Sequence, residues 1–308
     1  MTTNNKSPQV GYLLHLTHYD PGWNKRKDVE TPFDPDVGRA VIDALRANGF
    51  DLLILGCSDG LVYESHPELA RHYSIPKSIV AEVIAYARSR GLAVAPKLNF
   101  SQSAHHRHNH WFRPHNALFD SDEYWRLAFE VVDELIAMFS PSPFFHIGMD
   151  EDHDRSYTQY VEAIQALHDG LAARALRTMI WNDTAWHGPR AQIHREKALH
   201  AETRIPTDIL QVYWDYWELH PEDLRRLVSL GFATWIAPGA DPKLAAAWRR
   251  EVVENGGGGL LLTHWTPCVA ANRAALLQRI EALGPALTGT GATPDSVSTK
   301  LATKIPEA

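Results

Sequence analysis

The stretch from Phe144 to Asp154 reads FFHIGMDEDHD. Its first half is apolar and has the length of a strand. It then ends in five acidic or titratable residues: Asp150, Glu151, Asp152, His153 and Asp154. Removing carboxylates from water costs free energy unless they are paired, so a buried strand that ends in such a cluster delivers it to a cleft. The stretch therefore predicts a strand whose carboxyl end reaches a functional site.

Short apolar runs of the same kind recur along most of the chain, with amphipathic helical segments between them. The expected strands are VGYLLHL from Val10, DLLILG from Asp51, LAVAPKL from Leu92, FFHIGM from Phe144, LRTMIW from Leu176, DILQVYW from Asp208, FATWIA from Phe232 and GLLLTHW from Gly259. The expected helices lie at about 36–49, 74–91, 120–139, 155–173, 188–202, 221–230, 241–255 and 269–283. Strand and helix alternating eight times predict an α/β fold, a single (β/α)8 TIM barrel.

Length and composition agree with one catalytic-sized domain. The 308 residues exceed the roughly 250 that such a barrel needs. We expect a flexible N-terminus at 1–8, the barrel at 9–286, and a disordered tail at 287–308, which is low in large apolar residues.

Charge and hydropathy limit the partners of the protein. The net charge of -7 with no basic block argues against nucleic-acid binding. No apolar run approaches the roughly 20 residues that span a bilayer, and the first residues show no signal pattern. We expect a cytoplasmic protein with no membrane partner, and association into a homo-oligomer stays open.

A barrel carries its active site at the carboxyl ends of its strands. Carboxylates and tryptophans follow several of the expected strands, and the chain holds 10 Trp in all. Flat aromatic faces stack on the C–H surfaces of sugars, and carboxylates bind hydroxyls or transfer protons. The residues after the strands therefore indicate a carbohydrate site. We expect two or three of four candidates to face the pocket: Trp181, Trp214, Trp235 and Trp265.

The segment HIGMDE, His146 to Glu151, resembles the His-x-Gly-Gly-Asp-Glu signature of family 20 glycoside hydrolases, the β-N-acetylhexosaminidases. Further segments resemble the family in the same order, over about residues 10–283. They are SDGLVYESHPEL from Ser58, IPKSIVAEVIAYARSRGLAVAPKLNF from Ile75, WNDTAW from Trp181, QVYW from Gln211 and THW from Thr263.

The resemblance implies hydrolysis of a terminal β-linked 2-acetamido sugar by substrate-assisted retention, an exception to the two-carboxylate scheme. Glu151 would be the acid/base, and Asp150 would orient the acetamide group. The substrate would be a carbohydrate, and no cofactor or metal is expected. The substrate-binding residues would be His15, His18, Asp59, Glu64, His146, Trp181, Asp183, Tyr213, Trp214 and Trp265.

The sequence also departs from the family pattern. The family's strand 1 supplies an Arg that grips sugar hydroxyls, and here His15 and His18 follow that strand. Met149 replaces the second Gly of the signature. The family's tyrosine near strand 7 is missing, and Tyr213 is the candidate to take its place. These departures indicate a shifted substrate.

Two other functions stay open. His15 and His18, with Asp150 and Asp183, would suit a metal-dependent hydrolase or isomerase on the same barrel. A non-catalytic sugar-binding barrel would also keep the carboxylates. The histidine run at 105–110 contains residues that bind Zn²⁺ or Ni²⁺, but its lack of cysteine and of regular spacing favours adventitious binding or none.

Overall fold

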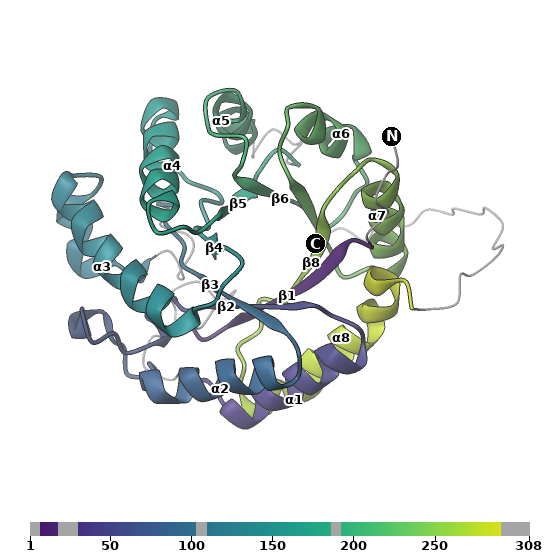
Figure 1. The fold of residues 1–308 in the computed structure, drawn as a ribbon, viewed down its shortest axis with the longest axis horizontal. Coiled ribbons are helices and arrows are strands. Elements are labelled where there is room, and N and C mark those ends of the chain that lie inside the picture. The colour runs from purple at the N-terminus through teal and green to yellow at the C-terminus, as the bar shows by residue number, and fades with distance from the viewer. Residues whose placement is uncertain (1–6, 18–29, 103–109, 186–191, 291–308) are drawn as a thin grey trace, which may run out of the picture.

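Eight parallel strands close into a barrel in the computed structural model, which describes residues 7–17, 30–102, 110–185 and 192–290 (Figure 1). Neighbours in the sequence are neighbours in the barrel, and β1 pairs with β8 to close it. The strands are β1 (Gln9–His15), β2 (Leu52–Gly56), β3 (Ala93–Lys97), β4 (Phe145–His146), β5 (Thr178–Asn182), β6 (Leu210–Asp215), β7 (Thr234–Pro238) and β8 (Gly259–Thr263). The predicted fold class is confirmed.

A helix follows each strand and packs on the outside of the barrel (Figure 1). The helices are α1 (Pro35–Ala47), α2 (Lys77–Ser89), α3 (Asp122–Phe139), α4 (Tyr157–Ala172), α5 (Gln192–Glu202), α6 (Pro221–Ser229), α7 (Pro242–Glu254) and α8 (Arg273–Thr288). Side-chain caps mark several of their starts. The Ser156 hydroxyl accepts from the Gln159 N–H while the Gln159 side chain accepts from the Ser156 N–H, which forms a capping box at α4.

Alternation along the strands builds two cores, because successive strand side chains point to opposite faces. Side chains that point inward fill the barrel; they include Leu13, Ile54, Ala95, Met179, Val212 and Leu261. Those that point outward pack under the helices; they include Tyr12, Leu53, Val94, Ile180, Tyr213 and Leu262. The barrel is therefore a packed core whose functional space lies at its rim.

Most observed boundaries lie within a few residues of the expected ones, and two differences bear on the site and on the extent of the barrel. Strand β4 pairs over only Phe145–His146, because the chain turns sharply at Gly148. Helix α8 continues to Thr288, two residues beyond the expected end of the barrel at 286, and is capped by Gly289 in the left-handed region. The proposed flexible ends lie largely outside the described residues. Within the described residues no helix has the length and apolar character to cross a bilayer.

Candidate active site

The turn after β4 has an unusual backbone. Gly148, Met149 and Glu151 all have left-handed φ angles, of 74°, 74° and 49°. This region is uncommon for residues with a side chain and persists only where the surroundings impose it. The turn is held by Asn99 Oδ1, which accepts from the Met149 N–H at 3.0 Å, and by the Tyr160 hydroxyl, which donates to the Met149 carbonyl at 2.9 Å.

Gly148 is required at its position for a second reason. A Cβ atom there would lie 2.2 Å from Asn99 Oδ1, so the close approach of Asn99 depends on the missing side chain. That approach lets the Asn99 Nδ2 donate to Asp150 Oδ1 at 2.7 Å. Asp150 is only 8% exposed, whereas the next side chain, Glu151, is partly exposed. The turn therefore presents a buried and a more accessible carboxylate side by side.

Asp183, which follows β5, supports this turn from the next strand. Its Oδ2 accepts from the Glu151 N–H at 2.7 Å, and its Oδ1 accepts from the Trp214 indole N–H at 2.9 Å. Burial raises the pKa of Asp183 well above its ordinary value, and the nearby Asp150 carboxylate adds to the rise. The two hydrogen bonds oppose it without cancelling it.

Lys97 and His146 lie beneath the carboxylates as register partners on β3 and β4. Burial lowers the pKa of Lys97 to about 8, although the Asp150 carboxylate opposes that shift. Burial and Lys97 lower the pKa of His146 well below its ordinary value. His146 Nδ1 accepts from the Gly148 N–H at 3.0 Å, so this ring is a neutral imidazole with its proton on Nε2. That Nε2 has no hydrogen-bond partner among the described residues.

Aromatic rings surround this mouth of the barrel. The His15 ring stacks on Trp265, with ring centroids 4.9 Å apart. Trp181 lies 6.3 Å from Trp265 and 4.6 Å from His146, measured between ring centroids. Three of the four tryptophans expected near the pocket are therefore here: Trp181, Trp214 and Trp265. The fourth, Trp235, pairs with Gly259 at the amino ends of the strands and packs on Phe144 in the barrel core.

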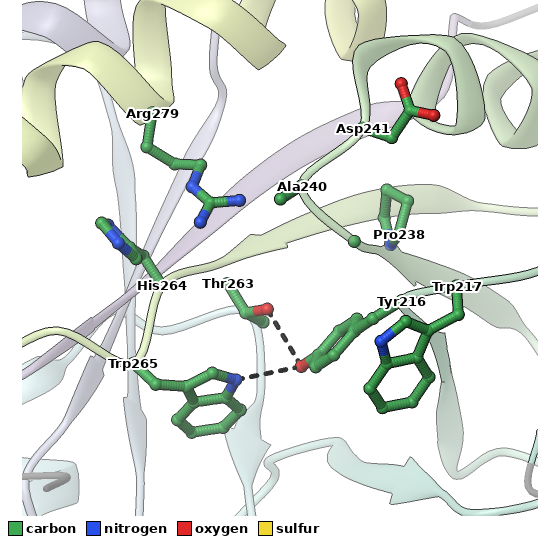
Figure 2. A pocket seen from close by; sticks show the side chains of 10 residues that line it. Tyr216, Trp217, Pro238, Ala240, Asp241, Thr263, His264, Trp265 and Arg279 are labelled. Atoms are coloured by element: carbon green, nitrogen blue, oxygen red, sulfur yellow. Dashed lines mark hydrogen bonds between the residues drawn. The ribbon is translucent and has the colours of Figure 1, made fainter. Parts of the chain in front are cut away.

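A cavity of about 400 Å³ adjoins this wall (Figure 2). Its lining includes Tyr216, Trp217, Pro238, Asp241, Thr263, His264, Trp265 and Arg279. The Tyr216 oxygen accepts hydrogen bonds from Thr263 Oγ1 at 3.0 Å and from Trp265 Nε1 at 3.2 Å, drawn as dashed lines in Figure 2. Trp217 is 70% exposed, and its ring lies 5.6 Å from that of Tyr216.

Tyr216 connects this cavity to the carboxylates. Burial raises its pKa to about 12, and the charges of Asp150 and Glu151 contribute in the same direction although the two hydrogen bonds oppose them. The hydroxyl is therefore protonated near neutral pH. Since it accepts from both Thr263 and Trp265, its own proton remains available to a ligand.

Three of the expected substrate-binding residues do not join this group of carboxylates and aromatic rings in the structure. Asp59 is buried and accepts from Thr17 Oγ1 at 2.5 Å, which joins the segment after β2 to the one after β1. The Glu64 side chain is 76% exposed and pairs with Lys77 Nζ at 3.1 Å. Tyr213 points outward from β6 and donates to Asp223 Oδ2 at 3.2 Å. His18 lies outside the described residues.

The sequence prediction missed Lys97, Asn99 and Tyr216 as site residues. Each carried a signal in the two-residue period of its strand. Lys97 continues the inward positions of Ala95 on β3, and Tyr216 continues those of Trp214 on β6. The interpretation of Tyr213 as the pocket tyrosine is corrected for the same reason: it occupies the outward position between two inward ones.

The donor atoms of His15, Asp150 and Asp183 do not gather as a metal site. Over the described residues, the one group of three histidine, cysteine or carboxylate ligand atoms within 4.8 Å of one another is formed by His66, Glu68 and His115. Most of the histidine run at 105–110, like His18, is outside the described part of the chain.

The fold of this chain is similar to that of several solved structures, although its sequence matches no known family. No family model matches the sequence, and no curated protein matches it. Solved structures do match. The structure of Dispersin B superposes with a TM-score of 0.62 at 17% identity, over 92% of this chain and 98% of that one. The GH20 β-N-acetylhexosaminidase of Streptomyces coelicolor A3(2) gives a TM-score of 0.67 at 17% identity, over 91% of this chain and 63% of that one. This barrel has the fold of the GH20 β-N-acetylhexosaminidases.

A third matching structure contains a bound product. A mutant Streptomyces plicatus β-hexosaminidase in complex with its product GlcNAc has a TM-score of 0.65 at 15% identity, over 89% of this chain and 63% of that one. The resemblance seen in the sequence is thus confirmed for the fold. This chain spans nearly all of Dispersin B and less than two thirds of the two Streptomyces enzymes.

Proposed function

We propose that this protein is a glycoside hydrolase that removes a terminal β-linked 2-acetamido sugar, with Glu151 as the general acid/base and Asp150 as the group that orients the acetamide. The observation that carries the proposal is the strained turn after β4. It holds the buried Asp150 against Asn99 at 2.7 Å and places the more accessible Glu151 beside it.

Asp150 suits an orienting role. Lys97 is close enough to Asp150 for the carboxylate to oppose the lowering of the lysine pKa by burial. At pH values below about 8 Lys97 therefore places an ammonium group near this carboxylate. An ionised carboxylate accepts the acetamide N–H and thereby turns the acetamide carbonyl oxygen toward the anomeric carbon. That oxygen is then the nucleophile, so no second carboxylate at nucleophile distance is required.

Glu151 suits proton transfer because it is the more accessible carboxylate of the pair. It protonates the glycosidic oxygen as the bond to the anomeric carbon breaks. In the second half of the reaction it takes a proton from the water that opens the cyclic intermediate. Asp183 fixes the Glu151 backbone through the 2.7 Å hydrogen bond to its N–H, which positions the acid.

Tyr216 completes the acetamide pocket in place of the tyrosine that the sequence lacks near β7. Its hydroxyl proton is available for the acetamide carbonyl, since the oxygen already accepts from Thr263 and Trp265. A donor at this point fixes the direction from which this oxygen attacks the anomeric carbon. The indoles of Trp181 and Trp265 give the acetamide methyl an apolar enclosure.

The test is hydrolysis of aryl β-GlcNAc and β-GalNAc beside aryl β-glucoside and β-galactoside, with and without a chelator. We expect cleavage of an acetamido sugar only, unaffected by the chelator. Cleavage of the plain sugars would instead indicate a protein nucleophile. Activity that the chelator abolishes would favour the metal-dependent alternative with His15 and His18. Saturable binding of GlcNAc without cleavage would indicate the sugar-binding alternative.

Tyr216→Phe is the matched probe of the acetamide pocket. The change removes one hydroxyl from a partly buried ring and leaves its packing on Trp214 in place. We expect kcat/KM for the acetamido substrate to fall about 10-fold or more, because one hydrogen bond that orients the attacking oxygen is lost. An unchanged kcat/KM would remove Tyr216 from the pocket.

A further inference from the structure

A second group of ligand-type side chains lies on the same end of the barrel, in the segments after β2 and β3. His66 and Glu68 stand at the short helix η2 (Pro67–Leu69), and His115 stands in η4 (Arg113–Leu118). Glu68 Oε1 lies 2.8 Å from His66 Nδ1 and 2.9 Å from His115 Nε2. These three atoms all lie within 4.8 Å of one another.

The distances between these atoms suit a small divalent cation. Bonds of about 2.0–2.2 Å from Zn²⁺ to imidazole nitrogen and carboxylate oxygen, in tetrahedral geometry, place neighbouring ligand atoms roughly 3.3 Å apart. The two contacts through Glu68 would lengthen by only a few tenths of an ångström. Two imidazoles and one carboxylate leave a fourth position for water, a ligand set that Zn²⁺ takes in many proteins.

One of the histidines already has the outer contact that is typical of a metal ligand. His66 Nε2, the ring nitrogen turned away from Glu68, lies 2.9 Å from Glu130 Oε2 on α3. A ligating histidine almost always donates its other N–H to a carboxylate or carbonyl, which fixes the ring and makes it more basic. The Phe112 ring lies 4.6 Å from the His115 ring and shields that side of the group.

Burial and charge also fit. The His66 and His115 side chains are 7% and 15% exposed, while Glu68 is 42% exposed and open to solvent. Partial burial raises the pKa of Glu68, but hydrogen bonds from His66, from its own backbone N–H and from His115 outweigh this and hold the pKa below its ordinary value.

We propose that His66, Glu68 and His115 form a binding site for a divalent cation of the zinc type, separate from the candidate active site, with Glu130 positioning His66. The site joins the segment after β2 to the segment after β3. From His115 the contacts continue through Phe112 to Trp111, whose rings lie 4.8 Å apart, and Trp111 Nε1 donates to the Asn99 carbonyl at 2.6 Å. A bound ion would thus stabilise the segment that contains the partner of Asp150.

The direct test uses full-length protein without a histidine tag, stripped with a chelator and titrated with Zn²⁺ by calorimetry. Co²⁺ is added in a parallel experiment, because its visible absorption reports tetrahedral nitrogen and oxygen ligation. We expect one Zn²⁺ per chain and a rise in Tm on binding, since the ion binds the folded state. If the wild-type protein shows no heat of binding and no change in Tm on addition of Zn²⁺, the proposed site is wrong.

The variants separate this site from the histidine run that precedes it. His115→Ala and Glu68→Gln should each abolish stoichiometric binding, and Glu130→Gln should weaken it by about 10–100-fold, the usual effect of losing an outer partner. Replacement of His105, His106 and His108 by Asn is the control and should leave binding intact. Binding that is lost in this control and kept in the His115 variant would overturn the proposal.

Folding and function are checked separately from binding. Circular dichroism in chelator should give a folded spectrum for each variant; if His115→Ala unfolds, His115→Gln replaces it, because Gln keeps much of the volume and is a poor zinc ligand. The readouts are metal stoichiometry and Tm, so they do not depend on hydrolysis. Loss of glycosidase activity in every assay would leave this site unaffected, and absence of Zn²⁺ binding would leave the proposed function unaffected.

Discussion

The turn after β4 and the segment after β2 both place acidic residues behind a buried strand, yet they use them in opposite ways. After β4, the neutral donors Asn99 and Trp214 hold Asp150 and Asp183. After β2, Asp59 accepts from Thr17 and faces Arg71 Nε at 3.5 Å. The Asp59 carboxylate, at the edge of the mouth, thus connects the segment after β2 to the segment after β1. Carboxylates grouped with one another and with an indole, as Asp183 is with Asp150 and Trp214, are instead typical of functional sites.

The difference lies in the partners and not in the acidic residues themselves. Asp59 and Asp183 are both 3% exposed, so burial alone does not separate them. The pKa of Asp183 rises because its burial is compounded by a second carboxylate. Perturbed carboxylates cluster at functional sites. The comparison therefore predicts loss of activity from changes after β4 and loss of stability from changes after β2.

The largest effect is expected for Glu151→Gln. The amide cannot transfer a proton, and general acid catalysis typically contributes 10²–10⁴-fold. We expect kcat on a nitrophenyl β-GlcNAc substrate to fall by about that factor, with an unchanged Tm. A substrate with a dinitrophenolate leaving group needs little protonation and should lose much less. Equal losses on both substrates would show that Glu151 is not the acid.

Asp150→Asn should have the next largest effect. Asn keeps the size of the side chain and can still contact Asn99, but it carries no charge to orient the acetamide N–H. Misplacement of a reacting group by about 1 Å can cost 10²-fold, and we expect a fall of that order in kcat with no more than a small change in Tm. Activity at the wild-type level would remove the orienting role.

Asp59→Asn tests the other side of the comparison. The change removes the carboxylate from the Thr17 hydrogen bond and from Arg71, and losing a buried partner of this kind costs roughly 1–3 kcal/mol of the free energy of unfolding. We expect that loss in urea unfolding, with kcat of the folded protein within about 2-fold of wild type. Thr17→Val removes the same hydrogen bond from its other end, so the double variant should show coupling. A fall in kcat at unchanged stability would move Asp59 into the site.

Asp183→Asn tests the site after β4 through the pH dependence of the free energy of unfolding. The folded pKa of Asp183 lies above the unfolded value of about 3.9, so between the two the native state binds more protons than the unfolded one. Stability contributed by the neutral acid is therefore present below the unfolded pKa and declines as pH rises toward the folded pKa. The decline is about 1.4 kcal/mol per pH unit in that window, and the Asn variant should lack it. If the free energy of unfolding changes with pH in the same way in the wild type and in the Asn variant, Asp183 does not have the raised pKa.

Strand and helix order, and the position of Asp150 and Glu151 directly after a strand, could be predicted from sequence because each depends on local pattern. The barrel follows from repeated apolar runs, and the acidic turn directly follows one of them. Beyond the last paired residue of a strand, whether a side chain points into the barrel or outward depends on the conformation of the chain where the strand ends. The two-residue period of β6 was enough to predict that Tyr213 points outward and Tyr216 inward. The direction of the Glu64 side chain could not be predicted in this way, because it depends on a 3.1 Å contact with Lys77, which is 13 residues away in the sequence.

The smallest effect is expected for Glu64→Gln. Its carboxylate lies 3.1 Å from Lys77 Nζ, which also lies 3.4 Å from Glu134. Water screens such an exposed pair, and pairs of this kind contribute about 0–1 kcal/mol; here Glu134 remains to accept the lysine. We expect the free energy of unfolding to change by less than about 0.5 kcal/mol and kcat/KM to stay at the wild-type level. A change of 10-fold or more in KM at constant kcat would show that Glu64 reaches the sugar after all. The segment after β2 would then belong to the site, and the contrast between the two acidic segments would reduce to Asp59 alone.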